Sequence, residues 1–312
     1  MKNYENDFLK NVPVAEIIEI ALSAGEKIMQ IYEKEFEVEY KEDKSPLTEA
    51  DRAAHGVICE GLQRLSGNEL TFPILSEEGR SIPYEERSKW ETYWCIDPID
   101  GTKEFIKKSG EFTVNIALIH KKEPVLGVVY APAIGELYYA KKDEGAYKER
   151  VNKREKRIER VKLPINQDRK EFVIVASKSH LNKETKNFID NLTSNIQHST
   201  FISKGSSLKL LMVAEGSADI YPRLGPTMEW DTAAADAIVR ESGKSVYEYV
   251  EGKVQGLRLK VQGSRCKVQG EGIEPSTQNL EPQTLNQRPK TFNLKPIPYN
   301  KPNLLNPWFI VA

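Results

Sequence analysis

One stretch constrains the fold more than any other, the string Trp94-Cys-Ile-Asp-Pro-Ile-Asp-Gly-Thr102. Its lead-in, Tyr93 to Ile96, is an apolar run that predicts a buried strand. Pro98 has no N–H to donate and a fixed φ, so we expect the strand to end there. A turn at that point would aim the carboxylates of Asp97 and Asp100 at one spot, so the string predicts a strand end that carries chemistry.

The same stretch offers ligands for a metal and for an anion. Two carboxylates and the Ile99 carbonyl are hard oxygen ligands, the kind that Mg²⁺ takes. Gly101 and Thr102 open a short helix predicted to run to about Lys107, and the free N–H groups of a helix N-terminus bind phosphate. A lone Asp-Pro turn would need no function, but the whole string favours a functional site.

The string Asp97-Pro-Ile-Asp-Gly-Thr102 resembles the signature of the Mg²⁺-dependent, lithium-sensitive sugar and nucleotide phosphatases related to inositol monophosphatase. Trp230-Asp-Thr-Ala-Ala234 resembles the second signature of that family, whose aspartate, here Asp231, is a further metal ligand. On its own, Asp231 could be an N-terminal helix charge favoured by the dipole. The resemblance implies an α/β fold with an α+β N-terminal lobe, the layered α/β/α/β/α sandwich of inositol monophosphatase and fructose-1,6-bisphosphatase.

Two earlier segments match the family as well. Ser45-Pro-Leu-Thr-Glu-Ala-Asp51 precedes a predicted helix, in which Thr48 suits the N-cap and Asp51 the third position, where an acid can reach back. The resemblance implies a further, compatible role, in which Asp51 pairs with Thr102 to polarise the attacking water. Leu75-Ser-Glu-Glu-Gly79 matches the family's metal-binding glutamate segment and makes Glu77 a ligand, although acids after a strand are usually solvated.

Three further strings narrow the resemblance to the 3′(2′),5′-bisphosphate nucleotidase branch of the family. They are K-G-S-S-L-K-L at 204–210, D-I-Y-P-R-L at 219–224 and G-P-T-M-E-W-D at 225–231. In that branch the matching side chains hold the substrate, which implies this role for Ser206, Lys209 and Arg223. A basic pair suits a second phosphate, which a monophosphate lacks. The plainer alternative is that Lys209 and Arg223 are surface cations.

The implied reaction is the hydrolysis of adenosine 3′,5′-bisphosphate to AMP and phosphate, a step of sulfur metabolism. The resemblance implies two or more Mg²⁺ ions, and a phosphate that is received by the N–H groups of Gly101 and Thr102 and borders the metal site. The alternatives are an inositol or sugar phosphatase of the same family, and an inactive nucleotide or metal binder. The implied metal ligands are Glu77, Asp97, the Ile99 carbonyl, Asp100 and Asp231.

Composition limits the classes of partner and the compartment that we expect for this chain. The chain of 312 residues carries 45 Lys+Arg against 46 Asp+Glu, so no overall field predicts a nucleic-acid polymer as partner. No stretch approaches the roughly 20 apolar residues that span a bilayer, and no apolar run of signal-peptide kind follows the N-terminus. The three cysteines lack metal or disulfide spacing, which suits a reducing cytoplasm. We expect a cytoplasmic enzyme, with peripheral attachment at the inner membrane and the oligomeric state left open.

Hydrophobic periodicity divides the chain into an N-terminal lobe, 1–150, and a C-terminal lobe, 151–312. The polar stretch 80–92 predicts a surface loop, and the charge-rich stretch 148–162 is interpreted as a solvated connector between the lobes. The first lobe is expected to have helices over 13–32 and after Thr48, a strand over 36–40, and a strand meander over 113–140. The second alternates strands at 172–176, 199–201 and 218–221 with helices at 183–192, 206–214 and 232–242.

A repeat interrupts the second lobe. Lys253-Val-Gln-Gly256 recurs at 260–263 and 267–270, and the prolines at 275, 282 and 289 keep the same spacing of seven. Glycine and proline at that period exclude a coiled coil, and the stretch has too few large apolar residues for a core. We interpret 253–293 as a low-complexity insertion, after which the family's pattern resumes over 294–312 with a final strand.

The insertion generates the first prediction. A protease should cut between 253 and 290 while the rest of the chain stays folded, because the repeat supplies no core. Joining Gly252 to Leu294 should leave activity unchanged and stability equal or higher, since each doubling of loop length costs only about 0.6 kcal/mol. Limited proteolysis and thermal melting of the two chains check this; a deletion that unfolds the protein contradicts it.

Overall fold

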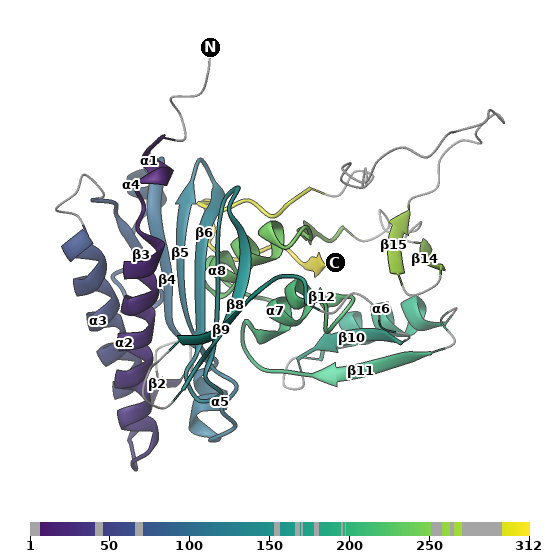
Figure 1. Ribbon diagram of the computed structural model, residues 1–312, viewed down its shortest axis with the longest axis horizontal. Coiled ribbons are helices and arrows are strands. Elements are labelled where there is room, and N and C mark those ends of the chain that lie inside the picture. Colours follow the sequence, from purple (N-terminus) through teal and green to yellow (C-terminus); the bar gives the residue numbers. More distant parts are fainter. Residues whose placement is uncertain are drawn as a thin grey trace.

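The structure is a computed structural model that describes residues 7–40, 46–65, 71–152, 157–165, 169, 171–177, 181–194, 196, 198–250, 258–262, 265–269 and 295–312. Its elements form five layers in which helices and sheets alternate (Figure 1). A helical pair covers a large sheet, a second pair lies between that sheet and a smaller one, and a last helix covers the smaller sheet. This is the layered α/β arrangement that the sequence predicts.

The large sheet has seven strands in the order β3–β4–β5–β6–β7–β8–β9, with β3 parallel to β4 and the other pairs antiparallel. The expected meander is confirmed as its centre. The strands are β3 (Ile74–Ser76), β4 (Thr92–Asp100), β5 (Thr113–His120), β6 (Glu123–Ala131), β7 (Glu136–Lys141), β8 (Gly145–Val151) and β9 (Arg157–Lys162).

Both faces of this sheet are buried, because successive side chains of a strand point to opposite sides. On β4, Trp94 and Ile96 belong to the core with the first helical pair, whereas Tyr93 and Cys95 belong to the core with the second pair. The first pair confirms the predicted helices. The two pairs are α2 (Val14–Tyr32) with α3 (Glu49–Leu65), and α7 (Leu208–Glu215) with α8 (Glu229–Glu241).

The smaller sheet is also covered on both faces. A parallel pair, β10–β11, and an antiparallel group, β12–β16–β13, meet through a bridge between Ile174 and Ile220. Val173 and Val175 face the α7–α8 layer, whereas Phe172 and Ile174 form a core with α6 on the outside. The elements are β10 (Phe172–Ala176), β11 (Ser199–Ser203), β12 (Tyr221–Arg223), β13 (Val246–Glu248), β16 (Phe309–Val311) and α6 (Lys183–Thr193).

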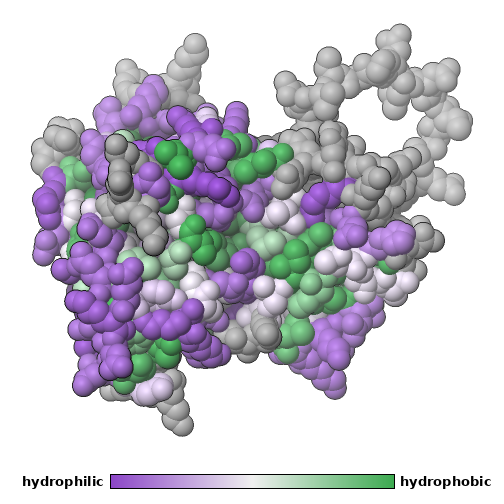
Figure 2. Space-filling model, turned by 60° about the horizontal axis from the view of Figure 1, so that its bottom comes forward, coloured by the Kyte–Doolittle hydropathy of each residue, from purple (hydrophilic) through white to green (hydrophobic). Residues whose placement is uncertain are grey.

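Short elements complete the described fold: α1 (Asp7–Lys10), the hairpin β1 (Val38–Tyr40) and β2 (Pro46–Thr48), α4 (Tyr84–Arg87) and α5 (Thr102–Ile106). None of the described helices is long and apolar enough to cross a membrane. Figure 2 shows one face of the molecule, on which hydrophobic side chains form separate small groups between hydrophilic ones.

The expectation that the strand beginning at Tyr93 ends at Pro98 is wrong. Strand β4 continues to Asp100, with a shift of register against β5 between Asp97 and Asp100. The parallel partner β3 pairs with β4 only up to Ile96, so Pro98 lies where the ladder is already irregular. A bulge accommodates a residue that has no N–H to donate and re-aims the neighbouring side chains.

The interpretation of 148–162 as a connector is also wrong. Residues up to Val151 belong to β8, and Arg157–Lys162 forms β9, which pairs with β8 at the edge of the large sheet. The sheet therefore extends past the expected lobe boundary at 150. Most side chains of β9 are exposed, and charged residues are a usual way to protect an edge strand. Composition alone does not distinguish such an edge strand from a linker.

The expected surface loop 80–92 contains a buried cation. Arg87, at the end of α4, is only 3% exposed. Its guanidinium donates to the carbonyls of Lys301 and Pro302 at 2.8 and 2.9 Å, and to Asn300 Oδ1 at 3.0 Å. The stretch is otherwise mostly at the surface, and Arg87 makes it a docking point for the C-terminal segment.

The expected final strand is confirmed as β16, which lies between β12 and β13. The chain on either side of the insertion comes together, because the Glu248 N–H donates to the Lys295 carbonyl at 2.8 Å. Within the insertion, β14 (Arg258–Gln262) and β15 (Arg265–Gln269) pair as an antiparallel hairpin, where the sequence predicted no strand. The remainder of 253–293 lies outside the described residues.

The close approach of α8 to β6 generates the second prediction. A Cβ on Gly127 would lie 2.1 Å from the Ala234 carbonyl oxygen. Gly127→Ala should therefore destabilise the protein by about 1–3 kcal/mol, as overpacking does, measured by urea unfolding. The control is Gly56→Ala on α3, where nothing lies within 4 Å of the added methyl. That change should stabilise the helix by about 0.5–1 kcal/mol, and equal effects of the two would contradict the packing argument.

Candidate active site

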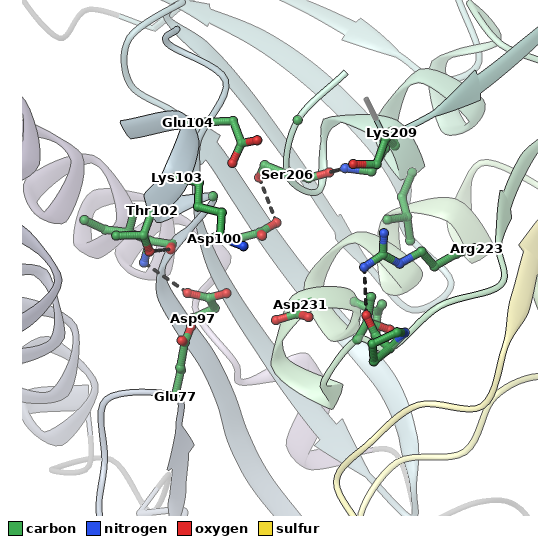
Figure 3. A pocket seen from close by; sticks show the side chains of 18 of the residues that line it. Glu77, Asp97, Asp100, Thr102, Lys103, Glu104, Ser206, Lys209, Arg223 and Asp231 are labelled. Carbon is green, nitrogen blue, oxygen red and sulfur yellow. Dashed lines mark hydrogen bonds between the residues drawn. The ribbon is translucent and has the colours of Figure 1, made fainter. Parts of the chain in front are cut away.

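A cavity of about 280 Å³ opens where β4 ends, between the two sheets. Its walls come from the start of α5, the loop before α7, strand β12 and the N-terminus of α8 (Figure 3). Most carboxylates lie on one side, together with Lys103, whereas Lys209 and Arg223 lie on the other. The labelled lining residues are Glu77, Asp97, Asp100, Thr102, Lys103, Glu104, Ser206, Lys209, Arg223 and Asp231.

Three predicted metal ligands converge in this cavity. Asp97, Asp100 and Asp231 each offer a carboxylate oxygen, and these atoms lie within 4.8 Å of one another. Figure 3 shows Asp231 reaching toward the other two from α8, with Glu77 next to Asp97. The structure thus brings together side chains from β4 and α8, which are far apart in the sequence.

The electrostatics of the cluster fit a divalent cation. Burial raises the pKa of Asp97 well above its usual value, and the charges of Glu77, Asp100 and Asp231 raise it further. Burial, followed by the charge of Asp100, raises the pKa of Asp231 to about 8. Carboxylates held this close repel one another when ionised. Hard oxygen ligands whose negative charges lack compensation are the donor set that Mg²⁺ or a similar ion requires.

Local backbone geometry creates the turn between the two signature aspartates. Asp97 Oδ1 accepts the Ile99 N–H at 3.1 Å, inside the bulge. Gly101 has φ +96°, and a Cβ there would lie 3.1 Å from the Glu111 carbonyl oxygen, so glycine is required for two reasons. Helix α5 starts directly afterwards at Thr102, as predicted.

Asp51 and Thr102 come together. Thr102 Oγ1 lies 3.3 Å from Asp51 Oδ1, which is long for a hydrogen bond between oxygens, and 3.3 Å from the Ile99 carbonyl. The other oxygen, Asp51 Oδ2, accepts from the N–H and the hydroxyl of Thr48 at 2.8 and 2.6 Å. Asp51 thus reaches back as expected, but the Thr48 hydroxyl donates to it rather than capping the helix as an acceptor.

Ser206, a predicted substrate-binding residue, lines the cavity and also contacts a carboxylate of the cluster. The hydroxyls of Ser206 and Ser207 both donate to Asp100 Oδ2 at 2.7 Å. Ser207 also lies 3.0 Å from the Asp231 carbonyl and accepts from Asn115 Nδ2 at 2.9 Å. This loop of the second lobe therefore orients a carboxylate of the first.

Sequence analysis missed Ser207, Asn115 and Thr113, whose hydroxyl lies 2.6 Å from that of Ser206. A signal was available for two of them. Thr113 and Asn115 are buried polar residues on β5, within a run that is otherwise apolar. Because buried polar groups are almost always hydrogen-bonded, such residues predict a partner, although not which one.

Lys209 and Arg223 are buried rather than surface cations, at 7% and 9% exposure, and both line the cavity. Lys209 Nζ donates to the Ser206 carbonyl, and Arg223 Nη2 donates to the Pro226 carbonyl at 2.7 Å. The buried Nε of Arg223 has no hydrogen-bond partner within the described chain. Burial lowers the pKa of Lys209 to about 8, despite the charge of Asp100. Two desolvated cations on one wall define an anion subsite.

Comparison with known proteins places this site in a family. The model of the Inositol monophosphatase family matches residues 10–290. The 3′(2′),5′-bisphosphate nucleotidase CysQ of Salmonella typhimurium is 46% identical over 240 residues, covering 76% of this chain and 91% of that protein. The CysQ of Escherichia coli K12 is 45% identical over the same length and coverage.

Solved structures agree. CysQ from Bacteroides thetaiotaomicron, at 40% identity, matches with a TM-score of 0.73 over 99% of this chain and 98% of that one. The Thermotoga maritima IMPase, at 27% identity, matches with a TM-score of 0.58 over 74% of this chain and 83% of that one. The chain belongs to the inositol monophosphatase family, a family of metal-dependent enzymes, and both the resemblance and the fold class are confirmed.

The raised pKa values generate the third prediction. Without metal, Asp231 holds a proton up to about pH 8 in the folded chain, but only to about 3.8 when unfolded. The folded state then binds more protons, so stability falls as pH rises between these values. Divalent metal should remove this loss. In chelator, Asp231→Asn should flatten the decline of Tm between pH 5 and 8.

The control for this measurement is Glu60→Gln, an exposed acid on α3 for which the slope should not change. Added Mg²⁺ should raise the Tm of the wild type more at pH 8 than at pH 5, and should raise that of Asp231→Asn less at either pH. A wild-type Tm that does not fall over this range would contradict the prediction.

Proposed function

We propose that the protein is a Mg²⁺-dependent 3′(2′),5′-bisphosphate nucleotidase that hydrolyses adenosine 3′,5′-bisphosphate to AMP and phosphate. The observation that carries the proposal is one cavity with two opposed subsites, an acidic cluster and a wall with two buried cations, Lys209 and Arg223. A substrate with two phosphates uses both, one at the reaction centre and one as an anchor. The names of the CysQ relatives support this assignment.

In this proposal the acidic cluster holds two or more Mg²⁺ ions. Bound metal supplies Lewis-acid stabilisation of phosphate charge and a water of lowered pKa. The chain contributes the ligand oxygens and fixes their orientation, as the hydrogen bonds from Ser206 and Ser207 to Asp100 do. The proposed ligands are Glu77, Asp97, the Ile99 carbonyl, Asp100 and Asp231.

Asp51 and Thr102 orient the attacking water. Asp51 Oδ2 accepts from the N–H and hydroxyl of Thr48, which leaves its Oδ1 directed at the Thr102 hydroxyl. When the Thr102 hydroxyl donates a hydrogen bond to Asp51, the lone pairs of the Thr102 oxygen can accept a hydrogen bond from the attacking water. The N–H groups of Gly101 and Thr102, at the start of α5, receive the phosphate that is cleaved.

The second phosphate is anchored by Lys209 and Arg223. A phosphate oxygen would complete the hydrogen bonding of Arg223 Nε and offset the burial of both cations. Ser206 lines the same cavity, so it borders the substrate while its hydroxyl holds Asp100. An inositol monophosphate offers this wall only neutral hydroxyls and no second phosphate, so the wall favours the bisphosphate.

The fourth prediction tests this selectivity. The wild type should release phosphate from adenosine 3′,5′-bisphosphate far faster than from inositol 1-phosphate in Mg²⁺. Lys209→Ala should raise KM for the bisphosphate about 10- to 100-fold, since a hydrogen bond to a charged group contributes about 1.5–3 kcal/mol. Its activity on inositol 1-phosphate should stay near the wild-type level.

Two variants frame that experiment. Lys107→Ala removes an exposed lysine just after α5 and is the matched control. It should change neither KM nor the rate of phosphate release for either substrate. Asp100→Asn should abolish phosphate release from both substrates because it removes a metal ligand. Equal loss on both substrates for Lys209→Ala would mean that the lysine is structural, and activity of Asp100→Asn within tenfold of wild type would refute the metal site.

A further inference from the structure

One loop links the two proposed subsites. It runs from Arg223, on the cationic wall, to Asp231, in the acidic cluster. The Pro226 carbonyl accepts from Arg223 Nη2 at 2.7 Å, and the Met228 N–H donates to Asp231 Oδ2 at 2.9 Å. The orientation of both side chains therefore depends on where the peptides of Pro226 and Met228 lie.

Residues beyond the insertion hold this loop in place. The Asn306 N–H donates to the Thr227 carbonyl at 2.8 Å, and the Glu229 N–H donates to the Leu304 carbonyl at 3.0 Å. A bridge of antiparallel type pairs Met228 with Leu305. The loop is thus bound, strand-like, to a segment that lies far away in the sequence.

The Asn306 side chain adds a contact that backbone pairing does not supply. It is 3% exposed, and its Nδ2 donates to the Met228 carbonyl at 2.7 Å. The same nitrogen lies 3.0 Å from Thr232 Oγ1 and 3.3 Å from Thr227 Oγ1. Met228 is therefore held at both ends, its carbonyl by Asn306 and its N–H by the Asp231 carboxylate.

We infer that Asn306 is a positioning residue that sets the orientation of Asp231 and Arg223 through the peptides of the loop 225–228. The segment after the insertion thereby affects both the metal subsite and the anion subsite, although Asn306 itself belongs to neither subsite. The inference rests on the proposed function for the identity of the two ligands. Residues that orient metal ligands typically alter metal affinity or activity 10- to 100-fold when changed.

A second buried asparagine in the same segment provides the control. Asn300 is 3% exposed, and within the described part of the chain its side chain exchanges hydrogen bonds with Arg87, at 3.0 and 2.7 Å. It docks the segment onto α4, and these side-chain hydrogen bonds do not reach the loop 225–228. Because Asn300 has φ +56°, glycine is the replacement that removes the amide without backbone strain.

The experiment compares Asn306→Ala, Asn306→Asp and Asn300→Gly in the full chain. Asn306→Asp keeps the shape but has no N–H for the Met228 carbonyl. Mg²⁺ affinity is measured by calorimetry without substrate, KM with adenosine 3′,5′-bisphosphate, and folding by thermal melting. Both Asn306 variants should weaken Mg²⁺ binding about 10-fold and raise KM about 10-fold while remaining folded. Asn300→Gly should lower Tm and leave both constants within twofold.

The outcomes separate this inference from the proposed function. If the Asn306 variants lose stability as Asn300→Gly does, but keep both constants within twofold of the wild type, Asn306 is structural and the inference is overturned. A wild type that binds Mg²⁺ but hydrolyses no bisphosphate would refute the proposed function. In that case weaker Mg²⁺ binding by the Asn306 variants still supports the inference, and unchanged binding overturns it.

Discussion

The mutual repulsion of three clustered carboxylates is the constraint on which the described site depends. Carboxylate oxygens of Asp97, Asp100 and Asp231 lie within 4.8 Å of one another, and the pKa values of Asp97 and Asp231 are raised. The fold holds the three side chains there through hydrogen bonds that each come from a different element. The β4 bulge directs Asp97, the loop before α7 directs Asp100, and Met228 directs Asp231. A bound divalent cation would offset the repulsion between these carboxylates. Its binding would therefore stabilise the folded state, although the hydrogen bonds already hold the carboxylates in place without metal.

Most of the site residues that could be predicted lie in short sequence motifs. Asp97, Asp100 and Thr102 share one turn, so a single stretch of sequence was enough to expect them together. Ser207 and Asn115 were missed because their partners come from the other lobe: Asn115 donates to Ser207, and Ser207 donates to Asp100. Hydrophobic periodicity predicts which face of an element is buried, but it does not predict which distant polar groups meet there.

The errors in the fold have the same origin. Arg87 looked like a loop cation because its partners, the carbonyls of Lys301 and Pro302, come from the other end of the chain. The charges of 157–162 suggested a linker, although an edge strand has good reason to carry them. By contrast, α2, the β5–β7 meander and β10 were predicted correctly, since each has a periodic apolar pattern that burial on one or two faces explains locally.

The position of β16 has a consequence for how the molecule assembles. This strand lies in the middle of its sheet, between two strands that precede the insertion, so the sheet cannot close until the chain has returned from it. Loop-closure entropy grows slowly with length, but contacts between distant parts of a chain form slowly. From β4 to β9 the large sheet has no such delay, because its antiparallel neighbours follow one another in the chain. We therefore expect the large sheet, which carries Asp97 and Asp100, to form before the sheet that needs β16, and the acidic cluster to be complete only after Asp231 joins it.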